Sequence, residues 1–197
     1  MPSATCSAAG SIRVRRSVVS SDVSAGPAPL PLAEINRMSP RDFRRALGEV
    51  FEGSPWIAER ALASRPFASR KALHEAMEQV MRDASREEQL ALLRAHPDLA
   101  TGAGRASALS AASRGEQAGA GLDRLSDPDY ERFGQLNARY RERFGFPFIV
   151  AVRKHDAASI LAAFERRLHN PVDAEIETAL SEIADITRFR LAALVTA

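Results

Sequence analysis

The chain has 197 residues, of which 45% are hydrophobic and 26% charged, a composition typical of a soluble globular protein with one domain. The formal net charge is +2, and residues 1–30, which hold Arg13, Arg15 and Arg16 against Asp22, account for all of it. Because the rest of the chain is neutral, it lacks the excess of positive charge that is usual for phosphate binding, and we expect no nucleic-acid partner.

The cysteine content and the absent motifs narrow the possible cofactors. Cys6 is the one cysteine, which excludes an internal disulfide and a zinc cluster built on thiolates. The sequence has no HExxH motif, no glycine-rich dinucleotide motif after a strand and no P-loop. It also lacks the run of about 18 apolar residues that a membrane helix needs. We therefore expect no metal, no organic cofactor and no membrane partner.

The N-terminal residues differ in composition from the rest. Residues 1–30 are rich in Ser, Ala, Pro and Gly, which predicts a disordered extension. The arginine- and serine-rich stretch 11–20 vaguely resembles an organelle transit peptide; a floppy extension or a start codon placed too early is the simpler interpretation. Residues 31–197 form the expected domain.

A regular helical pattern begins after the extension. Apolar residues recur at helical spacing, and most of the runs follow a serine or aspartate that can act as the N-cap. Eight helices are expected, starting at Ser39, Ser54, Ser69, Ser85, Ser113, Ser126, Asp156 and about residue 172. The apolar run at 146–152 fits either a strand or an extended buried segment. Because no second strand is visible, we expect an extended connector and an all-α, single compact domain.

The stretch 94–122 holds the best candidates for chemistry. His96 precedes Pro97, which disfavours helical backbone and predicts that the imidazole stands at a helix exit. Its ordinary pKa near 6.5 suits proton transfer, although it could instead only cap carbonyls of the preceding helix. Ser113 is the expected N-cap of the next helix, and Glu116 is either its capping-box partner or an acid–base group beside His96. Gln117 adds a carboxamide to the same helix end.

The remaining candidates are a lone arginine and two other histidines. Arg153 follows the apolar segment, where it either extends to solvent or clamps a carboxylate or planar amide through paired hydrogen bonds. His74 and His169 lie among charged residues within helices and are expected on the surface.

Four blocks of sequence, in this order, closely resemble the OHCU decarboxylases, which act on 2-oxo-4-hydroxy-4-carboxy-5-ureidoimidazoline (OHCU) between urate and (S)-allantoin. The blocks are residues 54–60 (SPWIAER), 96–99 (HPDL), Ser113 with Glu116 and Gln117, and 144–149 (FGFPFI) followed by Arg153. The resemblance covers residues 30–195. One departure is the stretch 101–105 (TGAGR), where the family often has a glycine and a lysine.

The resemblance implies a fold, a reaction and roles for particular residues. The fold would be all-helical and the protein a homodimer that uses no metal or organic cofactor. His96 would be the catalytic histidine and Glu116 its acid–base partner. The substrate-binding residues would be Ser113 and Gln117 for the heterocycle, with Arg153 and backbone groups of Pro97, Phe148, Ile149 and Val150 for its polar edges.

The expected function is therefore decarboxylation of OHCU to (S)-allantoin in urate catabolism. Two alternatives remain: a helical scaffold or interaction module that has lost activity, and a hydrolase of a related ureide, for which the sequence offers no convincing nucleophile. The last residues, 195–197 (VTA), are not a peroxisomal Ser-Lys-Leu signal, so the cytoplasm is the expected location.

Overall fold

The computed structural model describes residues 28–101 and 109–197, and within these ranges the fold is all-α. The expected disorder of the N-terminal extension and the unusual loop after Thr101 fall almost wholly on residues 1–27 and 102–108, outside the described ranges. The helices are α1 (Leu32–Ile35), α2 (Pro40–Leu47), α3 (Pro55–Ala61), α4 (Arg70–Arg82), α5 (Arg86–Ala95), α7 (Ala111–Gly119), α8 (Asp127–Phe144), α9 (Ala157–Arg167) and α10 (Val172–Leu194), with 3-10 turns η1 (Leu62–Ser64) and η2 (Val152–Lys154). The eight predicted helices are present, and α1 is an additional short one.

Side-chain caps explain where most of the helices begin. The hydroxyls of Ser39, Ser69, Ser85 and Ser126 each accept a hydrogen bond from the backbone N–H three residues later, as the sequence predicts. The prediction for α7 is wrong: the N-cap is Ser110, and Ser113 lies one turn inside the helix. Ser113 is therefore free to use its hydroxyl elsewhere.

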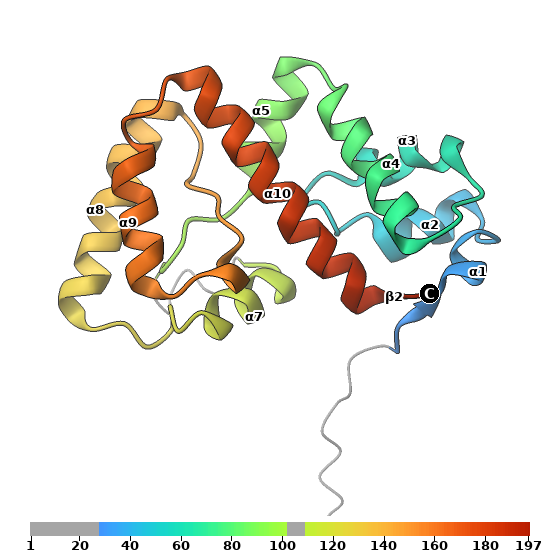
Figure 1. Ribbon diagram of the computed structural model, residues 1–197, viewed down its shortest axis with the longest axis horizontal. Helices are drawn as coiled ribbons and strands as arrows, with labels where there is room; N and C mark the ends of the chain where they lie inside the picture. Colours follow the sequence, from blue (N-terminus) through green and yellow to red (C-terminus); the bar gives the residue numbers. More distant parts are fainter. Residues whose placement is uncertain (1–27, 102–108) are drawn as a thin grey trace, which may run out of the picture.

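Helix α10 is the central element of the fold (Figure 1). It runs diagonally between α8 and α9 on one side and the helices α2 to α5 on the other, with α7 beneath it in this view. Its predicted apolar side chains Ile176, Leu180, Ile183 and Ile186 are all buried, at most 8% exposed. Because α10 contacts both halves, a residue on this helix can face elements that are distant in sequence.

Two short strands close the domain and were not predicted. β1 (Leu30–Pro31) pairs in parallel with β2 (Val195–Thr196), which brings the start and the end of the described domain together (Figure 1). Two residues per strand are too few to show an alternating pattern, so the pairing leaves no signal in the sequence.

The apolar segment 146–152 is an extended connector, as predicted, and it is buried throughout. Phe148 stacks on Phe164 of α9 with ring centroids 3.7 Å apart. Arg167 of α9 links the backbone of the connector to α10. Its Nη1 donates to the carbonyl of Ile149 (2.8 Å), and its Nε donates to the buried carboxylate of Glu175 (2.7 Å). Packing and hydrogen bonds thus hold the connector in place.

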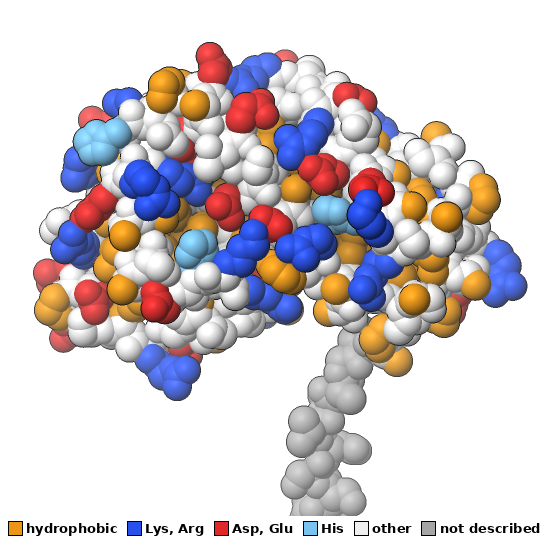
Figure 2. Space-filling model, in the orientation of Figure 1, with side chains coloured by type: hydrophobic (Ala, Val, Ile, Leu, Met, Phe, Trp, Pro, Cys, Tyr) orange, Lys and Arg blue, Asp and Glu red, His pale blue; other side chains and the backbone are white. Residues whose placement is uncertain are grey.

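The surface seen in Figure 2 is mixed in charge, and one of the two histidines expected on the surface is buried. Basic and acidic side chains alternate across the face seen in Figure 2, as the near-neutral charge of the domain leads one to expect. His169 is exposed, as predicted, but His74 is buried, and its Nε2 lies 2.9 Å from the carbonyl of Ala184. None of the described helices is long and apolar enough to cross a membrane.

Candidate active site

The end of α5 places an imidazole in the protein interior. His96 is the C-cap of α5 and has extended backbone (φ −73°, ψ 143°), as a residue before proline should. Its side chain turns back so that Nδ1 lies 2.9 Å from the carbonyl of Leu92, and the residue is only 6% exposed. Because a carbonyl only accepts, Nδ1 carries the proton and Nε2 carries the lone pair. The capping alternative and a chemical role for His96 are therefore compatible.

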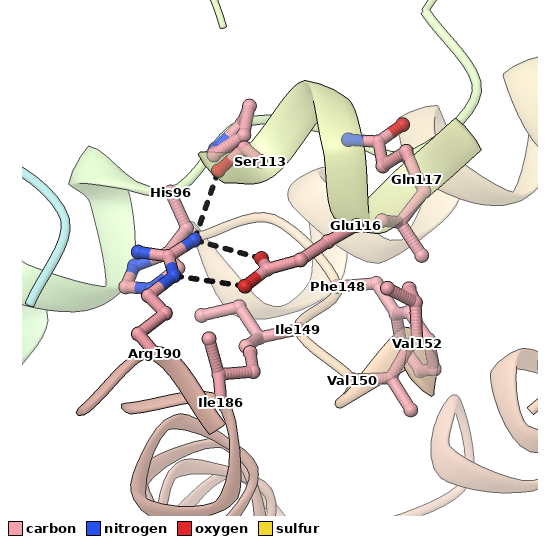
Figure 3. A pocket seen from close by; sticks show the side chains of 12 residues that line it. His96, Ser113, Glu116, Gln117, Phe148, Ile149, Val150, Val152, Ile186 and Arg190 are labelled. Carbon is pink, nitrogen blue, oxygen red and sulfur yellow. Dashed lines mark hydrogen bonds and ion pairs between the residues drawn. The ribbon is translucent and has the colours of Figure 1, made fainter. Parts of the chain in front are cut away.

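Arg190 of α10 joins the polar groups of the site through its whole guanidinium (Figure 3). Nε and Nη2 donate to the two carboxylate oxygens of Glu116 (3.0 and 2.9 Å), and Nη2 also donates to the hydroxyl of Ser113 (3.1 Å). On its inner edge, Nη1 donates to Glu52 (2.8 Å) and to the carbonyl of Val50 (3.3 Å). All five N–H groups that arginine carries have acceptors.

These contacts correct the interpretation of Glu116 and Ser113 as a capping box. The carboxylate of Glu116 makes a fork-to-fork pair with Arg190 and its side chain is 9% exposed. The hydroxyl of Ser113 donates to Glu52 (2.9 Å) while it accepts from Arg190. Both residues use the first turns of α7 to face the site.

Glu52 supplies a second carboxylate from the loop between α2 and α3. Burial alone would raise its pKa, but the charge of Arg190 and hydrogen bonds from Ser110, Arg190 and Ser113 outweigh this, so the pKa is lowered. Burial alone would lower the pKa of Arg190, but its pairs with Glu116 and Glu52 raise it. The pKa of His96 is lowered by burial, only partly offset by the Leu92 carbonyl and the nearby Glu52. The free site therefore holds two carboxylates, one guanidinium and a neutral imidazole.

A cavity opens beside these groups, with about 360 Å³ of empty space when its opening to solvent is included. The residues that line it are His96, Pro97, Leu99, Ser113, Glu116, Gln117, Phe148, Ile149, Val150, Val152, Ile186 and Arg190. Polar groups gather at one side of the cavity, and the buried connector and α10 form an apolar wall on the other (Figure 3). This is the usual construction of a small-molecule site, in which a few polar groups orient a ligand within apolar walls.

The predicted site residues come together in this cavity with one exception. Arg153 is not among the lining residues; it is exposed, and its guanidinium lies over the ring of Phe189, 5.9 Å from the centroid. Arg190 occupies the position of a clamping arginine instead. Its signal in the sequence was a charged residue four positions after Ile186, on the apolar face of α10. Glu52 follows a helix end within a turn, and the sequence offers no signal for it.

Gln117 lines the cavity and also fixes the loop after His96. Its side-chain oxygen accepts from the N–H of Ala100 (3.0 Å), and its NH₂ donates to the carbonyl of Asp98 (3.3 Å). Ala100 has a φ of 53°, a left-handed conformation that is strained for alanine. The carboxamide holds this turn, which leaves one N–H of Gln117 for a ligand.

Across residues 28–101 and 109–197, no three His, Cys, Asp or Glu side chains are grouped so that they could hold a metal ion.

Comparisons with known proteins identify the class to which this site belongs. The chain belongs to the OHCU decarboxylase family, whose profile matches residues 36–192. It is 50% identical over 163 residues to the 2-oxo-4-hydroxy-4-carboxy-5-ureidoimidazoline decarboxylase of Haloferax volcanii, a match that covers 83% of this chain and 95% of that protein. The family membership expected from the four sequence blocks is confirmed.

Solved structures agree with this assignment. A crystal structure of (S)-allantoin synthase superposes with a TM-score of 0.68 at 29% identity over 85% of this chain, which spans 54% of the length of that protein. An OHCU decarboxylase solved in the presence of (S)-allantoin superposes with a TM-score of 0.60 at 23% identity over 73% of this chain and 93% of that one, and has the same fold.

Proposed function

We propose that the protein decarboxylates OHCU and yields (S)-allantoin. The observation that carries this proposal is the convergence of His96, Glu116 and Arg190 on one cavity in a member of this family. The substrate is a small planar heterocycle whose ring carbon 4 bears a hydroxyl and a carboxylate. A cavity with a proton acceptor, a carboxylate and a guanidinium along one side suits such a ligand.

Arg190 is the proposed anchor for the anionic or polar edge of the substrate. Its outer edge, which bonds Glu116 and Ser113, borders the cavity, whereas its inner edge faces Glu52 and Val50. A guanidinium presents paired donors that match a carboxylate or an amide edge. Ser113 shares this outer edge and adds a hydroxyl that donates or accepts.

His96 is the proposed acceptor of the hydroxyl proton. Its Nε2 carries the lone pair because Nδ1 is bonded to Leu92. When the C–CO₂ bond breaks, its electron pair moves into the ring, and loss of the hydroxyl proton to Nε2 forms the carbonyl that the product carries at carbon 4. A positioned proton acceptor of this kind contributes about 10²–10⁴-fold to the rate.

The last step sets the stereochemistry. Loss of CO₂ leaves an enol-type intermediate, and protonation of the neighbouring ring carbon on a single face creates the (S) centre. Glu116 and His96 line the same cavity, so either can move the proton. The substrate also decays unaided, so control of this face is a central task of the enzyme.

The backbone N–H of Val150, in the extended connector, is a proposed donor to the polar edge of the substrate ring. The Ile149 carbonyl is bonded to Arg167, and the Val150 N–H of the same planar peptide points the opposite way. Within the described ranges this N–H has no hydrogen-bond acceptor. A buried, unpaired donor is costly, so it suits a ligand oxygen that carries developing charge.

Three further properties belong to the same proposal. The reaction needs no cofactor, because the ring itself accepts the electron pair released from the carboxylate. The protein acts as a homodimer, as the resemblance to the family implies. Its location is the cytoplasm, where soluble enzymes of purine breakdown would meet their substrate.

The decisive experiment generates OHCU in situ from urate and follows the circular dichroism and ultraviolet absorbance after the protein is added. We expect rapid formation of optically active (S)-allantoin by the wild-type protein and by His169→Asn, a control at an exposed histidine. His96→Asn should lose most of the rate enhancement while it remains folded. Unchanged decay to racemic product in the presence of folded wild-type protein would overturn the proposal in favour of a scaffold. A different product would instead favour hydrolysis of a ureide.

A further inference from the structure

The polar side of the cavity carries an excess of negative charge. Two carboxylates, Glu52 and Glu116, share the single guanidinium of Arg190, and both are within 3.0 Å of its nitrogens. The side chain of Arg190 is 6% exposed, so bulk water screens these charges little. His96 is the other titratable group beside them, and it is neutral. Counted over these described residues, the free site has a net charge of −1.

The hydrogen bonds indicate that both carboxylates are ionised and that the imidazole is not. Glu116 accepts two parallel N–H bonds from Arg190, and Glu52 accepts from Arg190 and from the hydroxyl of Ser113. Donors on both oxygens of Glu116, and two donors on one oxygen of Glu52 beside a guanidinium, favour the charged form of each carboxylate. His96 donates from Nδ1 to the Leu92 carbonyl, and burial favours its neutral form.

An anionic substrate adds a second uncompensated charge to this site. All five N–H groups of Arg190 are already used, so a carboxylate that binds its outer edge must compete with Glu116. The site would then hold three carboxylates and one guanidinium in a largely buried space. Like charges in such surroundings raise the affinity of the site for a proton.

We propose that Glu52, through its charge and its hold on Arg190, makes substrate binding proton-linked: the carboxylate of the substrate enters the cavity together with one proton. This inference rests on the proposed function for the identity of the anion. Glu52 does not line the cavity, so it is a positioning residue that acts on the substrate through Arg190.

The proton has a use in the reaction, which gives the linkage a chemical purpose. Decarboxylation converts the substrate anion and one proton into neutral allantoin and CO₂. The C–CO₂ bond breaks, the hydroxyl proton leaves, and the ring gains one hydrogen on carbon and one on nitrogen. The net demand is one proton, which is the number taken up on binding. It can rest on Nε2 of His96 or on Glu116, since both line the cavity.

A variant without the charge of Glu52 should bind the anion without a proton. In Glu52→Gln the free site is neutral, and the anion brings it to −1. A net charge of −1 does not require an added proton, because the free wild-type site has this charge while His96 is neutral. The uptake should therefore vanish in this variant. Glu59→Gln is the matched control, because Glu59 forms an exposed pair with Arg44 (2.6 Å) on neighbouring helices.

The test uses isothermal titration calorimetry with 2-oxoimidazolidine-4-carboxylate, a stable five-membered ring with a carboxylate at carbon 4. Titrations at pH 7.5 in HEPES and in Tris, whose ionisation enthalpies differ, measure the protons taken up. We expect about one proton per ligand for the wild type and Glu59→Gln, and about zero for Glu52→Gln. Above pH 7, the wild-type affinity should fall about tenfold per pH unit, and that of Glu52→Gln should stay flat.

Several results would overturn the inference. They are a wild-type uptake near zero, an unchanged uptake in folded Glu52→Gln, or no binding of the ligand to the wild type at millimolar concentration. If Glu52→Gln fails to fold, Glu116→Gln removes the other carboxylate and should lower the uptake equally; an unchanged value would be equally decisive. The titration needs no turnover, so failure of the proposed reaction and failure of the proton linkage are distinguishable.

Discussion

Replacement of Arg190 by methionine would remove the cation that joins the site while it keeps an unbranched apolar side chain. The variant loses the bonds to Glu52, Glu116, Ser113 and the Val50 carbonyl. The carboxylate side chains of Glu52 and Glu116 are 11% and 9% exposed, so water replaces the lost bonds poorly. Removal of one partner from a buried ion pair typically costs about 3–5 kcal/mol of stability, and we expect a loss in this range near neutral pH.

The loss should depend on pH in a defined direction. In the wild type the pKa of Glu52 is below its ordinary value of 4.5, so this group adds stability above that pH and the contribution is lost as the pH falls. Without Arg190, burial raises the pKa of Glu52 in the folded variant. The folded variant is therefore destabilised at pH values where this carboxylate is ionised in the unfolded chain. The difference in stability between wild type and Arg190→Met should therefore be largest at pH 7–8 and shrink towards pH 5.

Urea unfolding followed by far-ultraviolet circular dichroism at pH 7.5 and pH 5.0 measures this difference. Arg153→Met is the matched control, because Arg153 is exposed and its guanidinium lies over the ring of Phe189. The control should stay within about 0.5 kcal/mol of the wild type. A loss for Arg190→Met below about 1 kcal/mol at pH 7.5, or one that grows as the pH falls, would refute the assignment of two ionised carboxylates to this arginine.

Two further predictions concern the supports of the site. Ser110→Ala should lower stability by about 1 kcal/mol in urea unfolding because it removes the N-cap of α7, and no loss would contradict the cap assignment. Arg167→Met leaves the fully buried Glu175 without its cation and should cost about 3–5 kcal/mol. The double variant Arg167→Met/Glu175→Gln should recover most of this in a double-mutant cycle; additive losses would show that the two side chains are not coupled.

Much of the architecture follows from local rules that the sequence displays. Ser85 and Glu88 form the reciprocal capping box that their spacing predicts, and Gly145 ends α8 with a left-handed φ of 75°. His96 leaves its helix because Pro97 follows it. Such features depend on a few neighbouring residues, so they are legible without any tertiary contact.

The same local rules fail where two candidates satisfy them equally. Ser110 and Ser113 lie three residues apart, and either could cap α7 by its residue type. The outcome was decided by Glu52 and Arg190, which engage the hydroxyl of Ser113 from other parts of the chain. Arg153 was the expected clamp because it follows the apolar segment 146–152, but its side chain lies over Phe189 and is not part of the cavity lining.

The sequence by itself determined the helices, the extended connector and the family, because propensity, capping and motif order are properties of short segments. It also located the polar groups of α5 and α7 that meet in the cavity. Only the tertiary structure decided which arginine lines the cavity and that Glu52 accepts a hydrogen bond from it. Glu52 and Arg190 are 138 positions apart, and they meet because α10 crosses the whole domain. The charge of the site, on which its proton chemistry depends, is thus a property of the packed helices.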